Sequence, residues 1–567
     1  MKNYSNKLIL VGAFFFLLFI GAIYYFALPV FNFGNVGFYL FLGVMIVFII
    51  SIPLMLLSDL FIKWNKNKTF NKFEYDMYEK KYKRVAVDSS VKFSKKSIFL
   101  STVVSTFAII IVSLIIFVIC GSMLFNSKAY YKQLEVKEAP ESKLQEIFDY
   151  DKGNVLLPLI DKDLSFKLAQ ASLGDYGAQY IIDYNIFTLI SVSRNGKDEL
   201  VRITPLEYAN LFVSMNRIEE GTIGYIEVNV VTKEAKLIEV DGRLKYMPSA
   251  VLDYDLDRHI RFKYPTLLYD EYNFEIDDEG NPYWGIPTYK MEIGVINGPT
   301  PKGVLIVNPV TGEINNYNLG EEPKWVDRTV NEDIVDIQAT NSFRYKNGYF
   351  NVHFGQKKEV FQLSDGYNYF IKDGNTYYVS CITSPNENDQ TSIGFVTINL
   401  KTKEATKYFV NGMTEMRARE IAMNDARVKA QQLTATWPIL INYENVETYF
   451  IVLKNEVQAQ KVVFMNVKNG ELVAMGNTIE EARIEYDRLL ANSGNTENNS
   501  IKIEGEVLRI RDLGEQIEFI LKDHEEKYFV VSPSVSIDAR FIQVGDIVSL
   551  NCNDYGTYYY VLDLTKK

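Results

Sequence analysis

Four acidic side chains precede a polar turn in the middle of the 567-residue chain. Glu275, Asp277, Asp278 and Glu279 stand directly before Gly280-Asn281-Pro282. Clustered carboxylates bind cations, and a pair of them can act as the acid and the base of a hydrolase. A hairpin turn that is merely solvated has the same composition, and we favour this simpler interpretation. Asp277 and Asp278 are the acidic candidates for a ligand or partner surface.

A second acidic group consists of Asp253, Asp255 and Asp257, followed by His259. Alternating aspartates are typical of the start of a calcium-binding EF-hand loop, which needs a glycine at its sixth position. Counted from Asp253, that position holds Arg258. The pattern therefore predicts a solvated acidic turn, and we expect no metal or cofactor.

Residues for nucleophilic catalysis do not form a recognisable set. The chain contains no Gly-x-Ser-x-Gly motif, and its three histidines are far apart in the sequence. Cys120, Cys381 and Cys552 show no short spacing, which argues against a metal site or a disulfide framework. The sequence thus carries no positive signal for an enzyme. A hydrolase that uses Asp277 and Asp278 is kept as an alternative.

Two tryptophans next to turns are the aromatic candidates for the same surface. Trp284 follows Pro282-Tyr283, and Trp325 follows Pro323-Lys324. If their rings are exposed, they line a groove for a ligand. If the rings are buried, they pack one part of the body against another, which is the interpretation that we favour.

Three apolar runs near the N-terminus are each long enough to cross a bilayer as a helix. They are Leu8 to Val30, Val36 to Ile62 and Ile98 to Phe125, and a hydrocarbon core about 30 Å thick needs about 20 helical residues. The basic loop 63–97 holds eleven Lys/Arg against four Asp/Glu, which by the positive-inside rule makes it cytoplasmic. We predict three transmembrane helices within residues 1–126, with the N-terminus inside the cell. Everything after residue 126 is then extracytoplasmic.

The two parts of the chain differ in the sign of their charge. Residues 1–126 carry a net charge of +8 and the whole chain carries −11, which leaves −19 for residues 127–567. Nucleic-acid binding draws most of its affinity from Lys and Arg contacts with phosphates. We therefore do not expect nucleic acid as a partner.

The pattern Asn-x-x-[Thr/Asn]-[Gly/Lys]-Glu occurs four times after the membrane region. The copies begin at Asn229, Asn308, Asn399 and Asn466, and each follows a β-branched or aromatic run. Polar turn residues between two apolar runs predict a β-hairpin. Repetition of such a hairpin indicates a repeated α+β module with antiparallel sheets.

Helix start signals accompany these hairpins. Thr204, Thr414 and Thr478 are predicted N-caps, and the first and the last have a glutamate three residues further on. We place the repeat region at residues 158–490, after a short charged stalk at 127–157 and before a polar linker at 491–500.

The C-terminal residues 501–567 are predicted to hold five strands. Gly505 interrupts the first strand and permits a sharp coil there. A small all-β OB-like barrel is the predicted fold, and an SH3-like barrel is the alternative. No cluster of Arg and aromatic residues suggests that this barrel binds an oligonucleotide.

The four hairpins, each paired with a small helix, resemble PepSY modules, a short bacterial α+β unit of propeptides and cell-envelope proteins. Lys233 and Lys403 stand where the PepSY turn has Gly, and Asn stands at the start of each copy in place of the usual Asp. The whole region 158–490 also resembles an uncharacterised family of large membrane-anchored bacterial proteins. The residues that carry this second likeness are Asp257-Arg258-His259-Ile260-Arg261, Phe274 to Trp284, and Pro323-Lys324-Trp325-Val326-Asp327.

PepSY units are proposed to inhibit or restrain peptidases, so the resemblance implies binding of an envelope protein. The favoured function is therefore a membrane-anchored cell-envelope binding or scaffold protein that engages partners such as peptidases. A cell-wall or peptide hydrolase is the first alternative. An accessory subunit of a membrane transport or secretion assembly is the second, although Asp59 is the only ionisable residue within the predicted spans.

Overall fold

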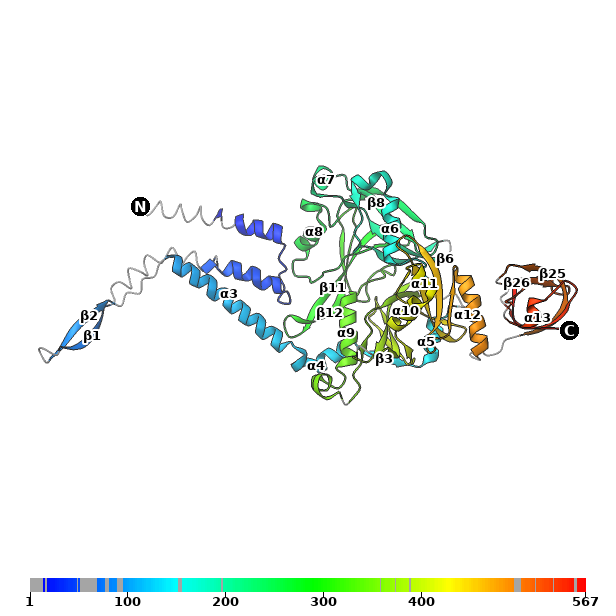
Figure 1. Cartoon of the computed structure of the whole chain (residues 1–567). Coiled ribbons are helices and arrows are strands. Elements are labelled where there is room, and N and C mark those ends of the chain that lie inside the picture. Colours follow the sequence, from blue (N-terminus) through cyan, green and yellow to red (C-terminus); the bar gives the residue numbers. More distant parts are fainter. Residues whose placement is uncertain are drawn as a thin grey trace.

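The computed structural model describes most of the chain and places an α+β body between an N-terminal helical part and a C-terminal barrel (Figure 1). The described residues are 14–15, 18–47, 49–50, 69–76, 81–88, 95–150, 156–194, 197–356, 358–372, 374–386, 389–493, 501–514, 516–533, 535–554 and 558–567.

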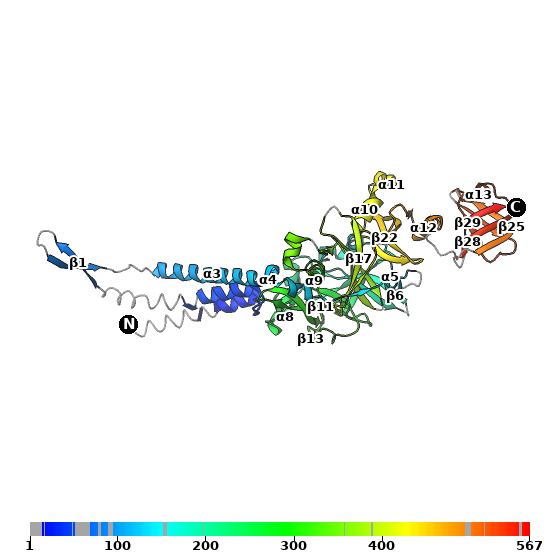
Figure 2. The same cartoon turned by 90° about the horizontal axis from the view of Figure 1, so that it is seen from below.

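One helix among the described residues is long and apolar enough to cross a membrane. This helix is α3 (Lys95–Cys120), whose segment Leu100–Cys120 has a mean hydropathy of 3.1. Only 11% of the most apolar stretch of this helix is buried inside the protein. The side chains of Ile109 and Ile115 are more than half exposed. The hairpin of β1 (Thr69–Asp76) and β2 (Lys81–Asp88) lies at the end of α3 remote from the body (Figure 2).

The prediction of three membrane-spanning helices is wrong. The apolar helices before α3 are shorter, Leu18–Ala27 and Val36–Val47. The chain leaves the first of them at Leu28, which has a left-handed φ of 44° before Pro29, because proline disfavours helical backbone at the preceding residue. Parts of the first two predicted spans, residues 8–13, 16–17, 48 and 51–62, lie outside the described residues. The fold is thus one candidate membrane helix joined to a multi-sheet α+β body with a five-stranded barrel.

Residues 121–147, which we call the entry segment, lead from α3 into the body. They contain α4 (Met123–Lys132), β3 (Val136–Ala139) and α5 (Glu141–Ile147). β3 pairs in parallel with β18 and forms the edge of a seven-stranded sheet. Leu134 and Leu144 are buried in two different cores of the body. Much of the segment expected to be a stalk is therefore packed into the body.

Two four-stranded antiparallel sheets with the strand orders β5-β6-β8-β9 and β10-β11-β12-β13 share one apolar core with α6. Thr204 does not begin a helix, because it lies in β6 opposite Ile226 of β8. The elements of this half are α6 (Lys162–Ser172), η1 (Gly174–Ala178), β4 (Tyr180–Ile181), β5 (Thr188–Arg194), β6 (Lys197–Pro205), β7 (Glu207–Tyr208), α7 (Leu211–Asn216), β8 (Thr222–Asn229), β9 (Ala235–Leu244), η2 (Leu252–Tyr254), α8 (Leu256–Lys263), β10 (Asn273–Ile276), β11 (Pro282–Ile293), β12 (Asn297–Val307) and β13 (Ile314–Asn318).

Two further sheets form the second half of the body. The larger has the order β14-β16-β17-β18-β3 and packs against α9, and the smaller has the order β20-β22-β23-β24 and packs against α12. The elements are α9 (Glu332–Arg344), η3 (Asn351–Gly355), β14 (Gln362–Leu363), β15 (Asn368–Lys372), β16 (Asn375–Thr383), β17 (Thr391–Asn399), β18 (Ala405–Tyr408), β19 (Gly412–Met413), α10 (Glu415–Asn424), α11 (Ala426–Ala430), β20 (Thr434–Ala435), β21 (Ile439–Tyr443), β22 (Val446–Lys454), β23 (Ala459–Asn466), β24 (Val473–Gly476) and α12 (Ile479–Ser493).

Each of the four sheets contains one copy of the repeated turn, which joins β8 to β9, β12 to β13, β17 to β18 and β23 to β24. In every copy the side chain of the first Asn accepts hydrogen bonds from the backbone N–H groups two and three residues later. Lys233, Gly312 and Lys403 occupy the fifth position with φ of 66°, 76° and 64°. The Asn therefore closes the turn, and three of the four copies have a left-handed backbone at the fifth position, where glycine is the least strained residue.

The C-terminal residues form a closed five-stranded barrel, as predicted, in the order β25-β26-β27-β29-β28. Its elements are β25 (Ile501–Asp512), β26 (Ile517–Leu521), β27 (Tyr528–Val531), α13 (Ile537–Arg540), β28 (Ile547–Asp554) and β29 (Tyr558–Lys566). Phe519 and Phe529 stack in its core with ring centroids 5.4 Å apart. The barrel contacts the body through Tyr558, whose hydroxyl donates to Glu480 at 2.9 Å.

Candidate functional site

The acidic candidates Asp277 and Asp278 lie in the turn between β10 and β11. Asp277 Oδ1 accepts hydrogen bonds from the backbone N–H groups of Glu279 at 3.0 Å and Asn281 at 2.8 Å. Asp278 is exposed. The carboxylate of Asp277 thus closes the turn itself, while Asp278 points no hydrogen bond into the turn among those described.

The two tryptophans are separated by the structure. Trp284 is fully buried, and its Nε1 donates to the carbonyl of Tyr246 at 2.9 Å. Trp325 is half-buried and stacks on Tyr283 with ring centroids 4.8 Å apart. Trp325 lies close to Asp277 through Tyr283, which interacts with that carboxylate, whereas Trp284 lies in the core.

Residues of the EF-hand-like group form hydrogen bonds with other groups of the protein. Asp255 caps α8 by accepting from the N–H of Arg258 at 2.7 Å, and Asp257 accepts from the hydroxyl of Tyr272 at 3.3 Å. His259 Nε2 lies 2.7 Å from the carbonyl oxygen of Gly312 in the second repeated turn. In the part of the chain that the structure describes, no group of three or more His, Cys, Asp or Glu is arranged to hold a metal ion.

A buried ionic network lies where the second sheet meets α9. The backbone N–H of Asp327 donates to Glu275 Oε2 at 2.9 Å. Arg328 forms an ion pair with Glu332, and its guanidinium lies over the ring of Tyr369 at 4.6 Å. The hydroxyl of Tyr369 also donates to Glu332, which joins the second sheet, α9 and β15.

Burial raises the pKa of two carboxyl groups in this network. Desolvation, together with the charge of Asp327, raises the pKa of Glu275 to about 8. Desolvation also raises the pKa of Asp327 to about 7. The side chains of Glu275, Asp327 and Arg328 are each at most 6% exposed, so the network serves as a joint between sheets and offers no access for a substrate.

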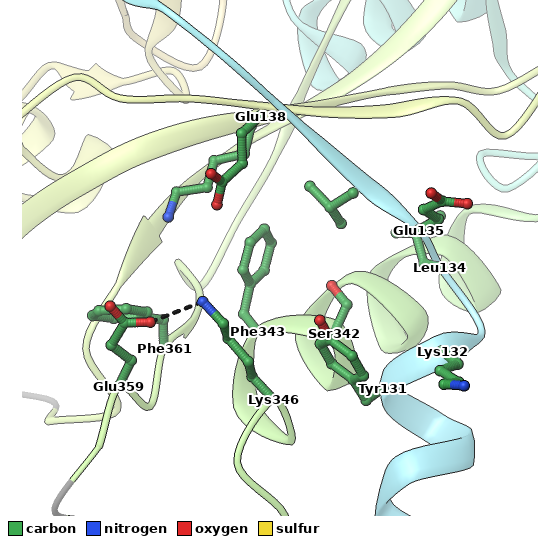
Figure 3. A pocket seen from close by; sticks show the side chains of 12 residues that line it. Tyr131, Lys132, Leu134, Glu135, Glu138, Ser342, Phe343, Lys346, Glu359 and Phe361 are labelled. Atoms are coloured by element: carbon green, nitrogen blue, oxygen red, sulfur yellow. Dashed lines mark hydrogen bonds and ion pairs between the residues drawn. The ribbon is translucent and has the colours of Figure 1, made fainter.

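A pocket of about 530 Å³, which we call the α4–α9 pocket, opens on the body (Figure 3). It lies between the entry segment, the C-terminal end of α9 and β18. Its lining residues are Tyr131, Lys132, Leu134, Glu135, Val136, Glu138, Ser342, Phe343, Lys346, Glu359, Phe361 and Lys407.

The lining combines an apolar wall with charges of both signs. Figure 3 shows the ring of Phe343 between Glu138 on the strand side and Lys346 on the helix side. Lys346 Nζ lies 3.0 Å from Glu359 Oε2, and this hydrogen bond raises the pKa of Lys346 and lowers that of Glu359. The pocket is thus closed on one side by an exposed ion pair.

Lys407 is a partly buried cation of the pocket and lies opposite Glu138 in the pairing of β18 with β3. Its Nζ lies 4.5 Å from the ring centroid of Phe409 and 5.7 Å from that of Phe361. Among the described residues it forms no ion pair, in contrast to Lys346. Partial burial lowers the pKa of Lys407, although the charges of Glu138 and Glu359 act in the opposite direction. A further carboxylate brought close by a ligand would also favour the charged form of Lys407.

The chemistry of this lining suits non-covalent binding. The twelve lining residues include no His and no Cys. Ser342 is the one serine among them, and its hydroxyl donates to the carbonyl of Ala339 at 2.7 Å. Aromatic and aliphatic surface with a few charged groups is the usual composition of a binding pocket.

Sequence reasoning missed this pocket because its walls come from three distant stretches, residues 131–138, 342–361 and 407. The only local signal was the charged segment after the apolar helix, which we expected to be a stalk. Pairing of β3 with β18 joins residues about 270 positions apart, and no motif records that contact.

Comparison of the chain with protein-family models and with curated proteins finds no match. The resemblance to PepSY modules therefore stays a prediction.

Proposed function

We propose that this chain is a membrane-anchored binding protein whose α4–α9 pocket holds an extended segment of a cell-envelope protein. The observation that carries the proposal is the pocket itself, in which Lys407 is partly buried near the rings of Phe361 and Phe409 and forms no ion pair among the described residues. The preferred segment would present an acidic side chain to Lys407 and an apolar side chain to Phe343 and Phe361.

The anchor in this proposal is α3. Its 21-residue segment Leu100–Cys120 matches the thickness of a hydrocarbon core, and its outward-facing Ile and Val side chains would be unfavourable in water. Because the chain enters the body directly from α3 through α4, the pocket stands close to the bilayer.

The orientation of the protein across the membrane follows from the distribution of basic residues on the two sides of α3. The basic segment of residues 63–97, which ends in the first turn of α3, holds eleven Lys/Arg, and positively charged flanks stay on the cytoplasmic side. The body after α3 is then extracytoplasmic, where envelope proteins are its available partners.

The edge position of β3 supports an extended partner. β3 pairs with β18 on one side only, among the strands that the structure describes. A free edge offers backbone donors and acceptors to an added strand. A peptide laid along β3 would place alternate side chains toward the pocket. The PepSY-like hairpins favour peptidases as the class of envelope partner.

The proposal is tested by selecting displayed peptides against the full-length protein in lipid nanodiscs. We expect extended sequences with an acidic residue next to an apolar one. Their affinity should fall at least about tenfold in Lys407→Glu, because a like charge replaces the attractive one, and should also fall in Phe361→Ala.

Phe541→Ala is the matched control, because Phe541 is equally aromatic, 67% exposed and located in the barrel. Peptides whose affinity is unchanged in Lys407→Glu and Phe361→Ala, or that lose affinity equally in Phe541→Ala, would refute this pocket as the binding site.

A further inference from the structure

Two phenylalanines project from the short helix η3 and from the residue that precedes it. Phe350 is 67% exposed and Phe354 is 78% exposed. They lie four residues apart, which puts them on one face of a helical turn, and their ring centroids are 6.1 Å apart. So much exposed aromatic surface on one turn marks a contact site.

The turn that carries these rings is firmly held. Val352 is buried with Tyr345 and Val360, and this cluster packs against Met123 and Tyr131 of α4. The side chain of Asn351 bridges to both backbone groups of Lys358 at 3.3 Å. The outward direction of Phe350 and Phe354 is thus built into the fold.

The position of η3 identifies what it faces. α4 begins at Met123, directly after α3 ends at Cys120, and Tyr130 of α4 donates its hydroxyl to the Gly121 carbonyl at 2.7 Å. In Figure 1 the green turn beside α4 lies at the end of the body where α3 arrives. η3 therefore stands next to the level at which the apolar surface of α3 stops.

The neighbouring side chains have the composition of a membrane interface. Leu124 and Phe125 at the start of α4 are 40% and 67% exposed, which continues the apolar surface of α3. Lys128 and Lys358 are exposed nearby. Aromatic rings at the headgroup level with basic residues around them are typical of protein surfaces that contact a bilayer.

We propose that η3 and the first turn of α4 form a lipid-contacting foot, in which Phe350, Phe354 and Phe125 insert at the boundary between headgroups and acyl chains. The foot rests on the proposed membrane anchoring by α3. It would fix the orientation of the body and hold the α4–α9 pocket, which shares Tyr131 with this cluster, just above the bilayer.

Site-directed spin labelling of the full-length protein in nanodiscs of phosphatidylcholine and phosphatidylglycerol tests the foot. In a Cys120→Ser background, Phe354→Cys carries the label, because Cys381 and Cys552 are buried. Ile115→Cys in α3 reports on the anchor, and Phe541→Cys in the barrel is the aqueous reference. The measured quantity is the ratio of label collisions with oxygen to those with a water-soluble nickel chelate.

We expect a ratio at Phe354→Cys severalfold above that at Phe541→Cys and close to that at Ile115→Cys. An aqueous value at Phe354→Cys with a lipid value at Ile115→Cys would overturn the foot and leave the anchor intact. Aqueous values at both positions would overturn the membrane anchoring and the foot together. All three exchanged side chains are at least half exposed, so the variants should fold.

Discussion

The backbone N–H of Asp327 donates to Glu275 Oε2 at 2.9 Å, while Glu275 Oε1 has no hydrogen-bond partner. The backbone of Asp327 thus contacts the carboxyl group of Glu275 beside Arg328, and burial raises the pKa of both acidic side chains. A neutral Glu275 satisfies this environment better than a charged one.

Stability should therefore depend on the protonation of Glu275. Its pKa is raised from 4.5 to about 8 on folding, so the folded state holds a proton that the unfolded chain has released. The stabilisation is complete below pH 4.5 and is lost as the pH rises through 8. Glu275→Gln cannot lose this proton, and we expect it to gain about 2 kcal/mol over wild type at pH 8.

Urea unfolding at pH 5 and pH 8, followed by the fluorescence of Trp284 in the adjacent core, measures this effect. Glu279→Gln is the control, because Glu279 is exposed in the same turn region. An unchanged pH dependence in Glu275→Gln would show that Glu275 is charged in the folded protein.

The repeated turns make a paired prediction about glycine. Lys233 is exposed and has a left-handed φ of 66°, so Lys233→Gly should stabilise the protein by about 0.5 kcal/mol. Gly312 occupies the equivalent position, but a Cβ there would overlap the ring of Tyr246. Gly312→Ala should therefore destabilise by about 1–3 kcal/mol.

Thermal unfolding of both variants checks this pair. We expect a higher melting temperature for Lys233→Gly and a lower one for Gly312→Ala. Shifts of the same sign would contradict this pair of predictions.

Leu134 tests how strongly the entry segment belongs to the body. Its side chain is 3% exposed in the core beside α9, and Leu134→Ala should cost about 2–4 kcal/mol. Hydrogen exchange should become faster in β3 and β18. Lys137→Ala is the control, because Lys137 forms only an exposed ion pair with Glu404, worth about 0–1 kcal/mol. Unchanged hydrogen exchange of β3 and β18 in Leu134→Ala would show that the entry segment is a stalk that is not packed into the body.

Lys407 should show a conflict between stability and binding. Partial burial lowers its pKa from 10.5, so the charged form is less favourable in the folded protein and its cost is present at neutral pH. Lys407→Met should raise the melting temperature and abolish selection of acidic peptides. A lower melting temperature would instead identify Lys407 as a structural cation. Lys346→Met, which removes an exposed ion pair, should leave the melting temperature nearly unchanged.

The features that the sequence predicts best are those built within a few residues. Thr414 and Thr478 accept hydrogen bonds from backbone N–H groups three residues later, at the starts of α10 and α12. The prediction of a helix N-cap at Thr204 was wrong although the local sequence has the pattern of a cap. Pairing of β6 with β8 outweighs this local preference.

The sequence alone determined the four Asn-initiated hairpins, the five-stranded barrel and one long apolar helix, because turn closure, alternation and helix hydropathy are local properties. Tertiary structure alone decided that Trp284 is a core residue, that Glu275 meets Asp327, and that β3 completes a sheet. Each of these depends on contacts between residues from about 40 to about 270 positions apart. The candidate pocket is of this second kind, since it exists only where the entry segment, α9 and β18 meet.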